Sequence, residues 1–96
     1  MRICKVVGHV WATKKEDSLV GLKLMVVNEM DASGRFKEDL FVAADVVGAG
    51  VGEQVLVVGG STARIAAGGN ELPVDCAIVG IIDTIEVERE KERKAQ

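Results

Sequence analysis

The stretch that decides the fold is residues 22–46, which read LKLMVVNEMDASGRFKEDLFVAADV. Two runs rich in Val, Leu and Ala, Leu22–Asn28 and Asp39–Val46, flank the letters DASG at positions 31–34. Apolar and β-branched residues favour extended strands, whereas Asp, Ser and Gly favour a turn. The pattern therefore predicts a β-hairpin whose turn lies near residues 31–34.

The rest of the chain repeats this composition. Together with the hairpin it predicts an all-β domain of five strands: Ile3–Trp11, Leu22–Asn28, Asp39–Val46, Gln54–Val58 and Ala77–Val87. Residues 13–18 are polar and indicate a solvated loop, and residues 61–67 fit a short helical turn that Gly68, Gly69 and Asn70 would end. Five strands within 96 residues favour one domain, folded as a small closed barrel.

Both faces of the predicted strands are apolar. In the second strand, for example, Leu24 and Val26 alternate with Met25 and Val27. A strand of a small barrel normally has one apolar face toward the lumen and one polar face in water. Since the barrel has a single lumen, we expect another copy of the same chain to cover the second apolar set. The alternative is that loops of the same chain cover it, or that these residues lie singly on the surface.

Charge and aromatic content narrow the range of partners. Twelve basic and fifteen acidic residues give a net charge of −3, and the aromatic residues are Trp11, Phe36 and Phe41. A domain that binds single-stranded nucleic acid needs aromatic platforms beside a basic groove, so this rival function is disfavoured and we expect no nucleic-acid partner.

No apolar run approaches the roughly 18–20 residues of a membrane span, and Met1 leads directly into a strand-like segment. We therefore expect a cytosolic protein with no membrane partner.

Residues that could support catalysis or metal binding are few. Cys4 and Cys76 lack the close spacing of a zinc or redox pair, and His9 is the single histidine. No Ser/His/Asp, Cys/His or metal cluster can be assembled from this set. We expect no catalytic residue, metal or cofactor, although two carboxylates that meet in space would keep a small enzyme as an alternative.

Two glycine-rich segments require separate interpretation. The letters GAGVGE at positions 48–53 suggest a dinucleotide fingerprint, but Glu53 stands where its third glycine belongs and a strand-like segment follows instead of a helix. The letters GGSTAR at positions 59–64 lack the lysine of a phosphate-binding loop. Taken alone, both segments indicate tight turns in which glycine permits positive φ or close backbone approach.

The same two segments carry a family resemblance. The letters DVVGAGVGEQVLV at positions 45–57, followed by GSTAR at 60–64, resemble the pentameric vertex proteins of bacterial microcompartment shells, the EutN/CcmL family, also called BMC-P. The resemblance continues through VVG at 6–8, LVGLKL at 19–24, PVD at 73–75 and IVGIID at 78–83, and so covers residues 1–87.

The resemblance implies a fold, a function and partners. The fold would be an OB-like β-barrel assembled as a cyclic homopentamer. The function would be structural, because the pentamer would cap the vertices of a polyhedral shell in the bacterial cytoplasm while enclosed enzymes perform the chemistry. The partners would be further copies of the chain and the hexameric shell proteins. We expect residues 1–87 to form the shell domain and residues 88–96 a charged C-terminal tail, which has both helical i,i+3 charge spacing and strand-like alternation.

The expected site is a contact between subunits rather than an active site. The glycines at 48, 50 and 52 would let backbones approach closely, and Arg64 would form an ion pair with Glu53 or Asp45 of the neighbouring subunit. Ser61 and Thr62 are candidates for lining a narrow axial opening. The candidate contact residues are Gly48, Ala49, Gly50, Gly52, Glu53 and Arg64.

Overall fold

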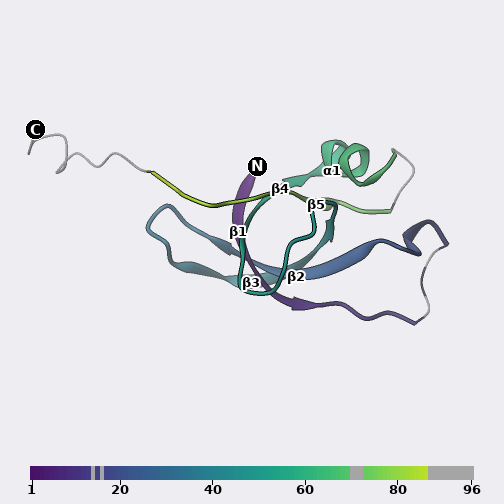
Figure 1. Cartoon of the computed structure of the whole chain (residues 1–96), viewed down its shortest axis with the longest axis horizontal. Helices are drawn as coiled ribbons and strands as arrows, with labels where there is room; N and C mark the ends of the chain where they lie inside the picture. The colour runs from purple at the N-terminus through teal and green to yellow at the C-terminus, as the bar shows by residue number, and fades with distance from the viewer. Residues whose placement is uncertain (14, 16, 70–72, 87–96) are drawn as a thin grey trace, which may run out of the picture.

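The five strands close into a single barrel in the order β1-β2-β3-β5-β4 (Figure 1). The structure is a computed structural model that describes residues 1–13, 15, 17–69 and 73–86. Its elements are β1 (Arg2–His9), the 3₁₀ turn η1 (Asp17–Leu19), β2 (Lys23–Met30), β3 (Phe36–Asp45), β4 (Gln54–Gly59), α1 (Gly60–Ala67) and β5 (Cys76–Ile81). The predicted five-stranded barrel is confirmed.

The hairpin of β2 and β3 forms as predicted, but its strands reach closer to the turn. The Asp31 carboxylate accepts a hydrogen bond from the Ser33 hydroxyl (2.6 Å) and from the backbone N–H groups of Arg35 (3.0 Å) and Ser33 (2.9 Å), and these bonds lower the pKa of Asp31. This tight turn lets Met30 pair with Phe36, so β3 begins three residues before the predicted Asp39.

Other predicted boundaries also differ from the structure, most of them by one residue. β1 ends at His9 rather than Trp11, and β5 ends at Ile81, with residues 82–86 outside any strand and Val87 outside the described residues. The polar segment 13–18 is a loop only in part, because η1 begins at Asp17, and positions 14 and 16 lie outside the described residues.

The helical segment is longer than a single turn. α1 has eight residues and starts at Gly60, one residue before the predicted start. It ends at Ala67 and is capped by Gly68, the first residue of the predicted stop, where φ is 135° and the backbone N–H donates to the carbonyl oxygens of Arg64 and Ile65. Asn70, the last residue of the predicted stop, lies outside the described residues.

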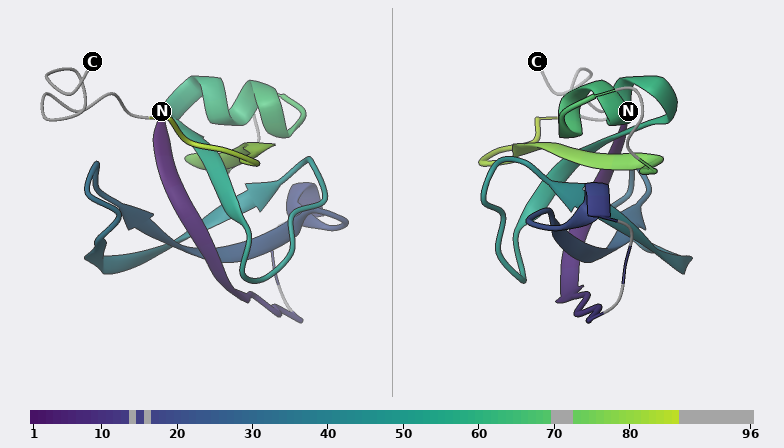
Figure 2. Two further views of the ribbon diagram at one scale, coloured as in Figure 1. Left: turned by 60° about the vertical axis from the view of Figure 1, so that its left-hand side comes forward. Right: turned by 90° about the vertical axis from the view of Figure 1, so that its right-hand side faces the viewer.

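The apolar residues form two clusters. The larger fills the barrel and consists of Cys4, Val6, Met25, Val27, Ala43, Ala49, Val55, Val57, Cys76 and Ile78. The smaller lies where α1 packs on the outer side of β4 and β5, and consists of Val58, Ala63 and Ala77 (Figure 2). The chain's own helix therefore covers part of the outward apolar set. In the part of the chain that the structure describes, no helix is long and apolar enough to cross a membrane.

Candidate subunit-contact site

The glycine-rich loop, residues 46–53, joins β3 to β4 and closes one end of the barrel. Its Ala49 side chain is completely buried in the core. Two backbone hydrogen bonds fix the loop to β1, from Gly52 N–H to the Val6 carbonyl (2.8 Å) and from Val6 N–H to the Glu53 carbonyl (2.9 Å). The loop is thus a rigid part of the barrel, and what Ala49 can offer to a neighbouring subunit is its backbone.

Asp45 organises the start of this loop. Its Oδ1 atom accepts hydrogen bonds from the backbone N–H groups of Val47 (3.0 Å) and Gly48 (3.1 Å), as in an Asx turn. Its side chain is fully buried, and Oδ2 lies 3.4 Å from Lys23 Nζ. The same ammonium group donates to the Ala49 carbonyl at 2.6 Å, so Lys23 holds both the carboxylate and the loop backbone.

Lys23 is a residue of this candidate site that the sequence reasoning missed. Lys23 and Asp45 face each other across the β2–β3 ladder, so the hairpin register brings them together. The sequence did contain a signal for this contact. Lys23 stands within an apolar strand, Asp45 stands at the end of the partner strand, and the hairpin register places the two residues opposite each other.

The three glycines of the loop, Gly48, Gly50 and Gly52, differ in whether their backbone conformation requires glycine. Gly48 and Gly52 adopt φ values of 80° and 95°, a region that residues with a side chain rarely occupy. Gly50 does not have positive φ; its N–H donates to Glu53 Oε1 at 2.6 Å, and a Cβ atom added there would lie 3.3 Å from that oxygen. Within one subunit, therefore, only Gly48 and Gly52 require glycine for their backbone conformation.

The residues of α1 lie away from the glycine-rich loop. β4 runs from the loop to α1, so the loop that contains Glu53 and the helix that contains Arg64 adjoin opposite ends of this strand. Figure 2 shows α1 on the outside of the barrel. Ser61 and Thr62 are exposed in the first turn of α1, and Arg64 is half-buried. Within one chain, the structure thus brings Glu53 into contact with Gly50. It does not bring Arg64 or Ser61 to these two residues.

The two predicted acceptors for Arg64 differ in access. Asp45 is fully buried beside Lys23 of its own chain, whereas Glu53 is exposed. Within one subunit, Glu53 is therefore the more accessible of the two predicted acceptors, and its pairing with Arg64 stays a prediction.

Comparison with known proteins identifies the family. A family model described as "Ethanolamine utilisation protein EutN/carboxysome" matches residues 1–83. The chain belongs to the EutN/CcmL family.

The relatives in this family are shell proteins. The carboxysome shell vertex protein CcmL of Synechococcus elongatus is 51% identical over 88 residues, which cover 92% of this chain and 89% of the relative. The structure of Gloeobacter violaceus CcmL matches with a TM-score of 0.87 at 44% identity, covering 92% of this chain and 91% of that one. A pentameric microcompartment shell protein, GrpN from Rhodospirillum rubrum, matches with a TM-score of 0.84 at 41% identity, covering 92% of this chain and 100% of that one. These names give no support to the alternative of single-stranded nucleic-acid binding.

The cysteines of this EutN/CcmL chain have the properties of core residues. Both are free and buried. Burial raises the pKa of Cys4 from its ordinary value of 9.0 to about 11, although the nearby Arg2 charge partly opposes this shift. Burial also raises the pKa of Cys76. Because the thiolate is the reactive form, neither residue is arranged as a nucleophile.

Within the part of the chain that the structure describes, His9 and the acidic side chains do not assemble a metal centre. His9 stacks on Trp11, with ring centroids 5.5 Å apart. Among residues 1–13, 15, 17–69 and 73–86, no group of three His, Cys, Asp or Glu side chains could hold a metal ion.

Proposed function

We propose that this chain forms a homopentamer that occupies the vertices of a polyhedral microcompartment shell in the bacterial cytoplasm and allows the shell to close. The observation that carries the proposal is the match, over the full length of that relative, to a pentameric microcompartment shell protein at 41% identity. A flat layer of hexagonal units cannot close, and five-fold units supply the missing curvature. In a cyclic ring, one surface of each subunit meets a different surface of its neighbour, so the angle between the two surfaces sets the number of copies.

The proposed contacts centre on the glycine-rich loop and α1. Gly48, Ala49, Gly50, Gly52 and Glu53 would present a rigid backbone surface to the adjacent subunit, and Arg64 of that subunit would pair with Glu53. The support is geometric, because the loop is fixed to β1 and its glycines leave the backbone uncovered. Ser61 and Thr62 are proposed to line the axial opening, since both are exposed at the start of α1.

A double-mutant cycle tests the proposed ion pair. Glu53→Gln and Arg64→Met should each weaken the ring, and together they should cost less than the sum, since the second change removes a group that has already lost its partner. Ring stability is measured as the protomer concentration at half-assembly. Strictly additive effects would contradict the pair and would leave an exposed arginine that contributes little.

The chain is proposed to be structural rather than catalytic, as the relatives named shell vertex proteins suggest. Hexameric shell proteins are its proposed partners in the shell, and residues 1–87 its proposed shell domain. Residues 88–96 are proposed to be a tail that the ring does not need. A chain shortened after Val87 should assemble as the full chain does, and loss of the ring would assign the tail a structural role.

Native mass spectrometry of the purified full chain tests the central proposal. The expected mass is five times that of the chain, and a stable monomer or a ring of another order would refute the assignment. A second experiment removes the gene from its host. We expect shells that fail to close, with closure restored by the gene supplied in trans; closed shells of normal shape without the protein would also refute the assignment.

A further inference from the structure

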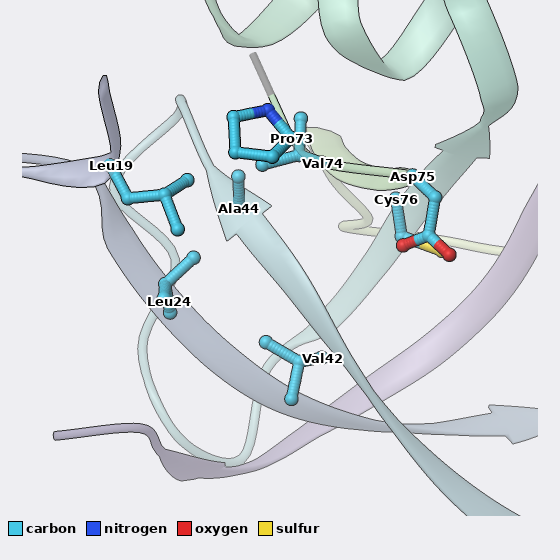
Figure 3. Close-up of a pocket in the computed structure, with 8 residues that line it drawn as sticks. All are labelled: Leu19, Leu24, Val42, Ala44, Pro73, Val74, Asp75 and Cys76. Carbon is cyan, nitrogen blue, oxygen red and sulfur yellow. The ribbon is translucent and has the colours of Figure 1, made fainter. Parts of the chain in front are cut away.

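Leu24 lines two hollows of the surface, and the two differ in charge. The first is a groove of about 220 Å³ with a mainly aliphatic lining, whose one charged lining residue is Asp75 (Figure 3). The Asp75 carboxylate would repel an anion from this groove. The second hollow, which we call the Trp11 pocket, has a volume of about 230 Å³, and its walls include His9, Trp11, Lys15, Leu22, Lys23 and Leu24. The Trp11 pocket is therefore the candidate for binding an anionic ligand.

The aromatic wall of the Trp11 pocket is held in place by the end of β1. Val10 N–H donates to the Leu24 carbonyl at 3.0 Å, so the chain stays beside β2 for one residue after β1 ends at His9. The Trp11 ring stacks on the His9 ring, with centroids 5.5 Å apart and ring planes 25° from parallel. His9 thus supports one side of the indole, while Trp11 is still 87% exposed. An open indole face can stack with a planar ring.

Two lysines supply the charge of the pocket, and they differ in how far that charge is balanced. Lys23 Nζ donates to the Ala49 carbonyl and lies 3.4 Å from the Asp45 carboxylate, so its charge is balanced within the subunit. Lys15 is exposed, and the ion pairs among the described residues do not include it. Within the part of the chain that the structure describes, no Asp or Glu lines the pocket. The pocket therefore offers one unbalanced positive charge beside an aromatic face.

We propose that the Trp11 pocket binds a small planar carboxylate, that is, an aromatic or heteroaromatic ring that carries one carboxylate group. The ligand ring would stack on Trp11 and contact Leu22, and its carboxylate would pair with Lys15. One unbalanced ammonium group matches a carboxylate better than a phosphate monoester, which carries about two negative charges at neutral pH.

The size of the pocket agrees with a ligand of this class. A cavity of about 150 Å³ can hold a benzene molecule, so the Trp11 pocket has room for one ring with its carboxylate. It does not have room for a helix or a strand of a protein partner. Its walls all come from one chain, so the inference goes beyond the proposed function and does not depend on the homopentamer.

Intrinsic fluorescence tests the proposal, because Trp11 is the single tryptophan and the chain has no tyrosine. The full chain, in its native assembly, is titrated with nicotinate, a pyridine ring with one carboxylate. We expect quenching that saturates with a dissociation constant of about 1 mM, an ordinary affinity for so small a ligand. Nicotinamide has the same ring without the charge, and it should bind at least about tenfold more weakly. Added salt should weaken the binding of nicotinate, because salt screens exposed charges.

Two pairs of variants assign the binding to the pocket. Lys15→Gln should weaken nicotinate binding at least about fivefold, whereas Arg35→Gln, which removes one positive charge from the exposed hairpin turn, should bind like the wild type. Trp11→Leu should weaken binding at least about tenfold, as measured by isothermal titration calorimetry because the variant has no tryptophan. Its control is Phe36→Leu, which removes an aromatic ring that is 49% exposed outside the pocket. Circular dichroism should show the same folded β protein for all four variants.

Several results would overturn the pocket assignment. Quenching that rises linearly with nicotinate concentration would be collisional, and equal affinity for nicotinate and nicotinamide would show that charge has no role. Equal losses in Lys15→Gln and Arg35→Gln would also refute the assignment. None of these results bears on the proposed vertex function, which native mass spectrometry tests by itself.

Discussion

The ion pair between Lys23 and the buried Asp45 allows a quantitative test of how the glycine-rich loop is held. Lys23→Met removes the ammonium group but keeps most of the aliphatic volume. In the structure, Asp45 Oδ2 has no hydrogen bond, and Lys23 Nζ at 3.4 Å is its ion-pair partner. The substitution therefore leaves a fully buried carboxylate with only its two backbone N–H donors.

The magnitude follows from burial. Removing one partner of a buried ion pair costs about 3–5 kcal/mol. The Lys23 side chain is 43% exposed, so water already screens the pair and the expected cost falls to about 1.5–3 kcal/mol. Asp45→Asn keeps an acceptor for the Val47 and Gly48 N–H groups and leaves Lys23 free to be hydrated, so we expect a smaller cost of about 1–2 kcal/mol.

The double variant distinguishes this account from two independent effects. With Asn at position 45, no charge remains buried, so adding Lys23→Met should cost little more than Asp45→Asn alone. Urea unfolding at one fixed protomer concentration measures all four chains, with native mass spectrometry to confirm that their assembly state is equal. Additive costs within about 0.3 kcal/mol would refute the proposed coupling.

Three further predictions concern the core and the loop. Burial raises the pKa of Cys4 from 9.0 to about 11, so the thiol loses its proton at lower pH in the unfolded chain than in the folded one. The free energy of unfolding should therefore fall as pH rises from about 9 to 11. Cys4→Ala should reduce this dependence on pH, as measured by urea unfolding at several pH values. Gly48→Ala and Gly52→Ala should each cost about 1–2 kcal/mol in the same assay, because φ is positive at both positions; a change below the error would contradict the strain argument. Gly50→Val should leave the subunit folded but prevent the ring in native mass spectrometry, and a normal ring would refute the proposed close approach.

The hairpin could be predicted because its determinants are local. Alternating apolar residues and a turn with Asp31 as hydrogen-bond acceptor lie within one continuous stretch. The C-terminal ends of β1 and β5 could not be predicted in this way. A strand ends where its hydrogen-bonding partner ends, and the partner belongs to a distant part of the chain. β4 begins at Gln54, and after Ile82 N–H donates to the Gln54 carbonyl at 2.8 Å the ladder has no further partner for residues 83–86.

The candidate site could be predicted only in part, for a related reason. The glycine-rich motif is visible in the sequence, and the positive φ at Gly48 and Gly52 agrees with its interpretation as a tight turn. The role of Lys23 depends on a cross-strand register that places it opposite Asp45, 22 positions away in the chain. The difference in burial between Asp45 and Glu53 could not be predicted either, because periodicity carries no information about burial at a strand end.

The distribution of outward apolar residues argues for a ring rather than for a tolerant monomer surface. α1 covers Val58 and Ala77, so the chain has its own means of shielding the outer side of β4 and β5. On β2 and β3, Leu40 and Val42 remain exposed among the residues that the structure describes. A subunit whose outer side is dehydrated by its neighbour needs apolar residues of this kind at the contact, and a closed ring supplies that neighbour.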